Sequence, residues 1–145
     1  MTFVATLSPS RDADCMVGDK TQPRILVIDD DTTPRMVIVK LAQRLGYATA
    51  EASTIAEAAA LIRSDKFDCM TLDLRMGSQY GTELLETMSI AQADVPVIVI
   101  SSADDDERWD VLRLAALYGI RVTEVPKPLE IGMLRKVFEE IRDLA

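Results

Sequence analysis

The sequence predicts an α/β fold in which five helices cover a parallel sheet of five strands. From Arg24 onward, short apolar runs alternate with segments of helical period, the pattern of a doubly wound sheet. Acidic, hydroxyl or ammonium side chains follow the ends of four of these runs. Ligands of an open parallel sheet bind at the carboxyl ends of its strands, so these side chains should meet at one edge.

Five apolar runs are predicted to form the strands. Pro126 follows the last run and removes an amide donor, which fits a strand at the edge of the sheet. The predicted strands cover residues 25–28, 48–52, 67–72, 97–100 and 122–125.

The intervening segments have the features of helices. Thr33-Pro34 predicts an N-cap with a first-turn proline, and Gly46 predicts the end of that helix. Thr54 and Glu57 are spaced as a capping box, which opens a second helix to about residue 64. The other three helices are expected around Leu84, Leu85 and Met88, from the acidic residues 104–107 to Gly119, and over residues 129–144. Trp109 and Tyr118 are expected to pack in the core or at its rim.

Length and composition indicate one folded domain in a reducing compartment. Residues 1–23 read as a flexible tail and residues 24–145 as the domain. Cys15 and Cys69 cannot form a disulfide framework, which favours the cytoplasm. The net charge of -8 and the lack of basic runs argue against nucleic-acid binding. No apolar stretch approaches the roughly 20 residues of a membrane span.

The chain contains no histidine. Catalysis by a Ser-His-Asp or Cys-His arrangement is therefore excluded. Any chemistry that passes through a phosphorylated imidazole must use a histidine of another protein.

The groups at the strand ends suit a divalent cation and a phosphoryl group. Asp30 and Asp73 are candidates for inner ligands of Mg2+, with Asp29 acting mainly through water. A carboxylate can attack phosphorus to form an acyl phosphate. Lys127 and Ser101 could then contact the phosphoryl oxygens as a point charge and a hydroxyl donor.

These residues resemble the receiver domain of bacterial two-component response regulators. The resemblance covers about 120 residues, from the end of the tail onward. It rests on four segments: residues 25–31, residues 72–76 with Gly81 eight positions after the aspartate, residues 96–101, and Lys127-Pro128. The resemblance implies a flavodoxin-like sheet in the order 2-1-3-4-5.

The resemblance also implies a role for each site residue. Asp73 would accept a phosphoryl group from a sensor histidine kinase or a phosphotransfer protein. Asp29 and Asp30 would bind Mg2+, with the backbone carbonyl of Arg75 as a further ligand. Ser101 would be the switch hydroxyl, and Lys127 would pair with the phosphoryl group and precede a cis peptide bond. A downstream output protein or domain would read the fourth helix, fifth strand and fifth helix, and a homodimer is compatible with this scheme.

Two positions depart from the family pattern. Glu124 stands where an aromatic switch residue is usual, so burial of an aromatic ring cannot be the readout. Gly77 replaces a common proline in the loop after Asp73. A lengthened segment before Gly119, together with residues 125–129, is similar to receivers joined to cyclic-di-GMP phosphodiesterase domains.

Two other functions remain open at this point. Asp29 to Thr33 fits the nucleophile pattern of haloacid-dehalogenase-type phosphatases, with Asp29 as nucleophile, but that scheme leaves Asp73 and Gly81 unexplained. A receiver-like interaction module that is never phosphorylated would account for Glu124, although such a module would be expected to lose its acids first. The preferred interpretation is a phosphoacceptor switch rather than an enzyme.

Overall fold

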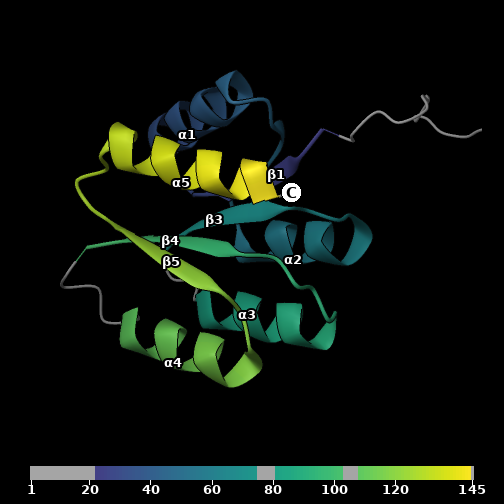
Figure 1. Cartoon of the computed structure of the whole chain (residues 1–145). Helices are drawn as coiled ribbons and strands as arrows, with labels where there is room; N and C mark the ends of the chain where they lie inside the picture. Colours follow the sequence, from purple (N-terminus) through teal and green to yellow (C-terminus); the bar gives the residue numbers. More distant parts are fainter. Residues whose placement is uncertain (1–21, 75–80, 103–107, 145) are drawn as a thin grey trace, which may run out of the picture.

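Five strands alternate with five helices in the computed structural model, which describes residues 22–74, 81–102 and 108–144 (Figure 1). Every helix and strand that the sequence predicts is present. The elements are β1 (Arg24–Ile28), α1 (Thr32–Arg44), β2 (Ala48–Ala52), α2 (Ile55–Ser64), β3 (Cys69–Asp73), α3 (Gly81–Ile90), β4 (Val97–Ser101), α4 (Arg108–Tyr118), β5 (Val122–Pro126) and α5 (Ile131–Leu144).

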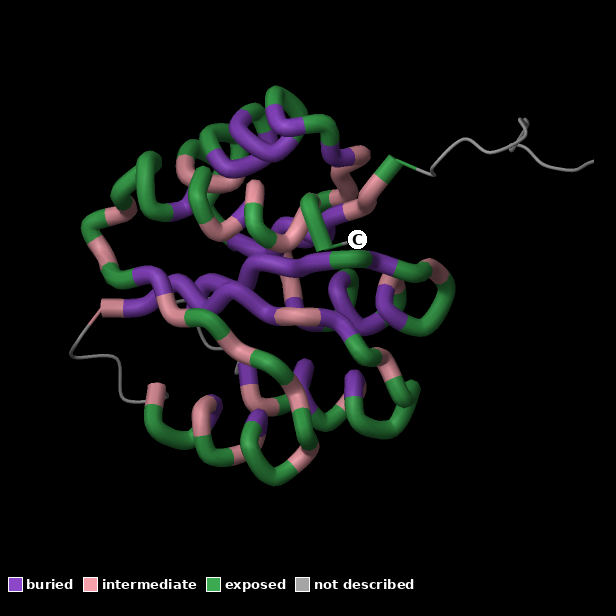
Figure 2. The backbone as a smooth tube through the Cα atoms, in the orientation of Figure 1, coloured by how far each residue is buried: buried purple, intermediate pink, exposed green. Residues whose placement is uncertain are grey.

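The strands form one parallel sheet in the order β2-β1-β3-β4-β5, which confirms the predicted fold. Every residue of β3 and β4 is buried, whereas the outer strands β2 and β5 have partly exposed residues (Figure 2). Because β5 is an edge strand, Pro126 is tolerated at its end as expected.

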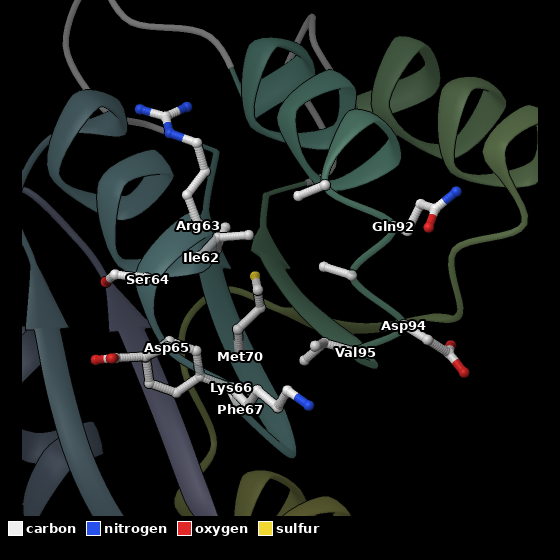
Figure 3. Close-up of a pocket in the computed structure, with 12 residues that line it drawn as sticks. Ile62, Arg63, Ser64, Asp65, Lys66, Phe67, Met70, Gln92, Asp94 and Val95 are labelled. Carbon is white, nitrogen blue, oxygen red and sulfur yellow. The ribbon is translucent and has the colours of Figure 1, made fainter.

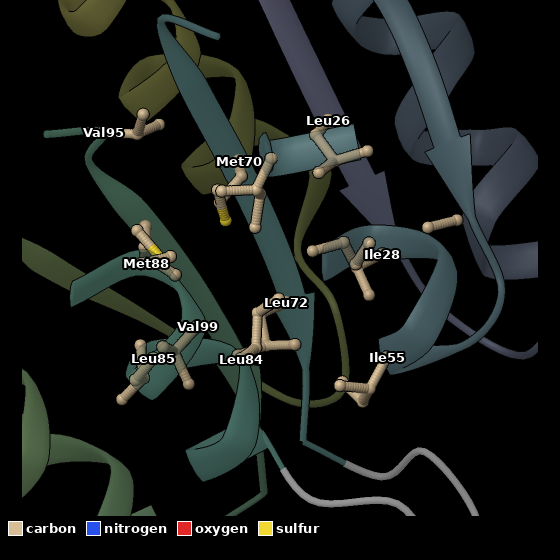
Figure 4. Packing of buried hydrophobic residues seen from close by; sticks show 14 of the residues in the cluster. Leu26, Ile28, Ile55, Met70, Leu72, Leu84, Leu85, Met88, Val95 and Val99 are labelled. Carbon is tan, nitrogen blue, oxygen red and sulfur yellow. The ribbon is translucent and has the colours of Figure 1, made fainter. Parts of the chain in front are cut away.

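Helices cover both faces of the sheet and enclose two apolar clusters. Side chains alternate along each strand, so Leu26 and Ile28 of β1 point to one face, and Ile25 and Val27 to the other. The first cluster, between the sheet and α2, α3 and α4, contains the predicted Leu84, Leu85 and Met88, together with Leu26, Ile28, Met70, Leu72 and Val99 (Figure 4). The second lies under α1 and α5 and contains Ile25, Val27, Cys69, Ile98, Ile100, Leu134 and Phe138.

The caps of the first two helices differ in how well the sequence predicts them. Asp31, not Thr33, is the N-cap of α1, and its side chain accepts a hydrogen bond from the Thr33 amide at 3.3 Å. The predicted cap of α2 is confirmed, since Thr54 Oγ1 accepts from the Glu57 amide at 3.0 Å. In turn, Oε1 of Glu57 accepts a hydrogen bond from the amide of Ser53, at 2.8 Å.

Helix α4 is held to the rest of the domain by few buried side chains. Val111 and Ala115 are buried, and Tyr118 packs partly against the first cluster. The expectation that Trp109 packs in the core or at its rim is wrong, because the residue is 64% exposed. It lies two positions before Val111, which turns it away from the sheet on a helix of 3.6 residues per turn.

The structure also tests the expected cis peptide bond and the expected start of the last helix. The peptide bond between Lys127 and Pro128 is cis, as the resemblance implied. Helix α5 begins at Ile131 rather than Leu129, which packs partly against the second cluster. The acidic residues 104–107 lie outside the described residues. None of the described helices is long and apolar enough to span a membrane.

Candidate functional site

The predicted site residues stand at the carboxyl ends of neighbouring strands. Asp73 is the last residue of β3, Ser101 is the last residue of β4, and Lys127 follows β5 directly. The register pairs Asp73 with Ile100, and Ser101 with Pro126, which places these residues at the same edge. Arg75 lies outside the described residues, so the structure does not place its carbonyl.

A cavity of about 350 Å³ opens at this edge of the sheet. Four predicted site residues line it: Asp29, Asp30, Asp73 and Lys127. Its walls also include Asp31, Pro34, Ile38, Ile100, Pro128 and Leu129. Ser101 is buried at the adjacent strand end and is not among the lining residues. The cavity therefore combines four aspartates and an ammonium group with apolar side chains.

An ion pair crosses the site between Lys127 and Asp73. The Nζ atom of Lys127 donates to Oδ1 of Asp73 at 2.8 Å. The lysine is anchored through its backbone, because its amide donates to the Ser101 carbonyl at 2.9 Å. Asp73 is almost fully buried, so the ammonium supplies a positive charge where water has little access.

Asp29 is the most buried carboxyl group of the site, with 2% of its surface exposed. Its Oδ1 atom accepts a hydrogen bond from the Asp31 amide at 2.9 Å. Burial raises the pKa of Asp29 to about 6, and the nearby charge of Asp73 adds to this effect, whereas the Asp31 amide and Lys127 oppose it. The site therefore holds more negative charge than Lys127 alone neutralises, which favours binding of a proton or a cation.

The carboxylates supply only part of a metal-ligand set. Across residues 22–74, 81–102 and 108–144, no three His, Cys, Asp or Glu side chains gather closely enough to hold a metal ion alone. Asp29 and Asp73 are buried, while Asp30 is exposed at the cavity. This arrangement fits a hard cation that keeps several water ligands, because two or three carboxylate oxygens then suffice.

Sequence reasoning missed the role of Arg35. Its guanidinium NH1 donates to the backbone carbonyl of Asp29 at 2.7 Å, and its Nε donates to Glu51 on β2 at 3.0 Å. The side chain thus fixes the segment between β1 and α1 that carries Asp29 and Asp30. A cation in the first turn of a helix opposes the dipole, so its position was a signal that a dedicated partner existed.

A second cavity, of about 360 Å³, lies at the opposite edge of the sheet (Figure 3). It is formed by the end of α2, the start of β3 and the segment before β4. Phe67, Met70 and Val95 give it an apolar lining, with the exposed Lys66 and Asp94 at its rim. It has no cluster of carboxylates and stands away from the carboxyl ends of the strands, so it is not the predicted site.

Comparison with known proteins decides the family. The sequence model of the response regulator receiver domain matches residues 25–138. This chain belongs to that family. Receiver domains are the regulatory phosphoacceptor modules of two-component response regulators rather than enzymes, so the phosphatase interpretation is set aside.

Curated relatives agree with this assignment. The two-component response regulator ARR2 of Arabidopsis thaliana is 30% identical over 120 residues, which cover 81% of this chain and 17% of that protein. Sporulation initiation phosphotransferase F of Bacillus subtilis is 25% identical over 112 residues, covering 77% of this chain and 87% of that protein. The chain spans between 17% and 24% of the length of three Arabidopsis relatives that it matches.

Solved structures show the same fold. The receiver domain of the Francisella response regulator 1452 superimposes with a TM-score of 0.69 at 25% identity, covering 84% of this chain and 98% of that one. The chemotaxis response regulator CheY4 of Vibrio cholerae gives a TM-score of 0.69 at 21% identity, covering 83% of this chain and 99% of that one. At this identity, the similarity to CheY4 supports the fold alone.

Proposed function

We propose that Asp73 is the residue that accepts the phosphoryl group in this receiver domain. The supporting observation is the ion pair of Asp73 with Lys127, at 2.8 Å, beside the buried carboxyl group of Asp29. An oxygen of Asp73 attacks phosphorus, so that a P–O bond forms while the P–N bond to the donor imidazole breaks. The imidazole nitrogen leaves with the bonding electrons and takes up a proton.

Lys127 and Ser101 stabilise the transferred group. The ammonium of Lys127, already on Oδ1 of Asp73, pairs with a phosphoryl oxygen after transfer. The Ser101 hydroxyl, at the end of the adjacent strand, donates to another phosphoryl oxygen. Both contacts form only in the phosphorylated state, so they favour a second conformation of this edge.

Mg2+ is the proposed cofactor. Asp29, Asp30 and Asp73 would hold it together with the backbone carbonyl of Arg75. When bound, the ion neutralises charge on the phosphoryl oxygens. The raised pKa of Asp29, caused first by burial and then by the charge of Asp73, supports this proposal, because a cation would stabilise the buried carboxylate.

The proposed partners follow from this chemistry. Because the chain has no histidine, the phosphoryl donor is a sensor histidine kinase or a phosphotransfer protein in the cytoplasm. The receiver passes its state to a downstream output protein or domain. This role requires neither direct nucleic-acid contact nor a membrane anchor.

The test uses phosphoramidate, whose P–N bond mimics that of phosphohistidine, with Mg2+ and intact-mass detection. The parent should gain one phosphoryl group, and Asp73→Asn should gain none. Asp68→Asn is the matched control, because Asp68 is an exposed aspartate just before β3, and it should react like the parent. Unchanged uptake by Asp73→Asn would overturn the assignment, and no uptake by the parent would favour a non-phosphorylated interaction module.

A further inference from the structure

An ion pair joins the first residue of α4 to the edge strand of the sheet. The Nε atom of Arg108 lies 2.7 Å from Oε1 of Glu124, in the middle of β5. The two side chains are 27% and 30% exposed, so the contact is partly shielded from water. Glu124 is one of the two residues that depart from the family pattern, and its side chain has a specific partner in the structure.

The sheet geometry explains why Glu124 faces α4. Val125 belongs to the cluster under α1 and α5, whereas Val122 packs against the cluster on the other face. Side chains alternate along a strand, so Glu124 shares the face of Val122. Its register partner Val99 is buried in the same cluster. A carboxylate at this half-buried position needs a charged partner, and Arg108 provides it.

The ion pair anchors the first residue of α4 to β5. Of the residues of this helix, all of which the structure describes, Val111 and Ala115 are the buried ones, and both come after Arg108 and Trp109. The Arg108 guanidinium also stacks over the ring of Trp109, with 4.8 Å to the ring centroid. Glu124, Arg108 and Trp109 therefore form one connected unit, which we call the α4 latch.

Both sides of the latch are connected to the phosphorylation site. Glu124 precedes Lys127 by three residues, and Lys127 contacts Asp73 directly. Arg108 begins the helix that follows β4, whose last residue, Ser101, accepts a hydrogen bond from the Lys127 amide. If Ser101 and Lys127 move, the end of β5 and the start of α4 are therefore expected to move as well. These are the two elements that the latch joins.

We propose that the α4 latch holds the unphosphorylated conformation and that phosphorylation of Asp73 opens it. This inference rests on the function proposed above. The phosphoryl group draws Lys127 and Ser101 to its oxygens, which shifts β5 relative to the start of α4. A partly exposed ion pair stabilises only modestly, so a small displacement is enough to open it. Opening releases the Arg108 guanidinium from Glu124 and changes the surroundings of Trp109. The Trp109 ring is on the surface, where a partner protein could contact it.

Thermodynamic linkage makes this proposal testable without a partner protein. If phosphorylation opens the latch, then breaking the latch must favour the open conformation over the closed one by the same factor at equilibrium. Uptake becomes faster because the open conformation, with Lys127 and Ser101 placed to contact the phosphoryl oxygens, is the one that reacts. Because an ion pair of this exposure contributes little, we expect Glu124→Gln to take up phosphate from phosphoramidate about two- to fivefold faster than the parent. The charge-reversed double variant R108E/E124R should return the rate toward that of the parent.

Trp109 is the single tryptophan of the chain, so its fluorescence reports on the latch. The emission of the parent should change on phosphorylation with phosphoramidate and Mg2+. Glu124→Gln should show the changed emission before phosphorylation and respond little afterwards. The matched controls Glu130→Gln and Arg113→Gln remove exposed charges nearby and should behave like the parent.

Intact mass measured on the same samples separates the two proposals. If the parent gains phosphate but Glu124→Gln matches it in emission and rate, the latch is wrong and the phosphoacceptor function stands. If the parent gains no phosphate, the phosphoacceptor function fails, and the latch fails with it. Acceleration equal to that of the Glu130→Gln control would also overturn the latch, because it would reflect net charge alone.

Discussion

The ammonium of Lys127 lies 2.8 Å from Oδ1 of Asp73, which joins the end of the edge strand β5 to the central strand β3. The lysine side chain is 31% exposed and that of the aspartate 8%. The lysine therefore covers the carboxylate from the solvent side. This contact places a positive charge where the oxygens of a phosphorylated Asp73 would lie.

Replacing Lys127 by alanine should destabilise the fold and raise the pKa of Asp29. The lost contact is a hydrogen bond to a charged group, so we expect the free energy of unfolding to fall by about 1–2 kcal/mol. The pKa of Asp29 should rise above about 6, because the charge of Lys127 lowers it in the parent. Urea denaturation and pH titration measure the two effects. Lys127→Arg keeps the charge, and equal losses in both variants would contradict this account.

Arg35→Ala should weaken Mg2+ binding without removing a ligand. The arginine holds the Asp29 carbonyl at 2.7 Å, and loss of such a supporting contact typically lowers metal affinity about tenfold or more. Calorimetric titration with Mg2+ measures the change. Arg44→Ala removes the same charge from the exposed end of α1 and is the control. Equal affinity losses in the two variants would show that net charge, rather than positioning, is responsible.

The stability of the protein should depend on pH through Asp29. Its pKa is about 6 in the fold and 3.8 without burial, so the native state binds the proton more tightly than the unfolded state. The stability from this proton is present below about pH 4 and is lost as the pH rises through about 6. Asp29→Asn should therefore be more stable than the parent at pH 7.5 without divalent cations, by about 1–3 kcal/mol.

Chemical denaturation at pH 5 and pH 7.5 measures that difference. Asp110→Asn, on the exposed face of α4, is the control and should follow the parent at both values. An identical pH dependence in Asp29→Asn and the parent would show that Asp29 does not carry the effect.

Gly81→Ala should destabilise the domain by about 1–3 kcal/mol, because it overpacks the core. A Cβ atom at Gly81 would lie 3.1 Å from a Leu72 methyl and 3.3 Å from a Leu74 methyl. Gly132 in α5 is the matched control, since a Cβ there meets nothing within 4 Å. Gly132→Ala should stabilise by about 0.5–1 kcal/mol. Thermal unfolding of both variants measures the contrast, and a neutral Gly81→Ala would contradict the packing argument.

The sequence predicted the layers of the fold because its apolar runs are short, separate and bounded by turn residues. It predicted the N-cap of α1 incorrectly because Asp31 and Thr33 are both good capping residues. The local hydrogen bond from the Asp31 amide to the Asp29 side chain favours Asp31. The position of Trp109 was predicted wrongly, because aromatic character alone does not show which face of a helix packs against the sheet. The smaller Val111 and Ala115 occupy the inward positions instead.

The sequence predicted those site residues whose chemical type and position at the end of a strand indicate their role. Asp29, Asp30, Asp73 and Lys127 line one cavity because parallel strands all end at the same edge. The partners of the supporting arginines were not predictable, because each partner lies 16 residues away on a strand of the sheet. Arg35 reaches Glu51 on β2, and Arg108 reaches Glu124 on β5. Only the three-dimensional structure reveals such pairs.

The central claim is tested most directly by locating the phosphoryl group within the chain. Borohydride reduces an acyl phosphate to an alcohol, which converts the modified aspartate into homoserine and marks it permanently. Trypsin should separate residues 25–35, which contain Asp29, from residues 67–75, which contain Asp73. We predict homoserine at position 73 after treatment with phosphoramidate and Mg2+, and none in residues 25–35. Homoserine at position 29 or 30 would contradict the account.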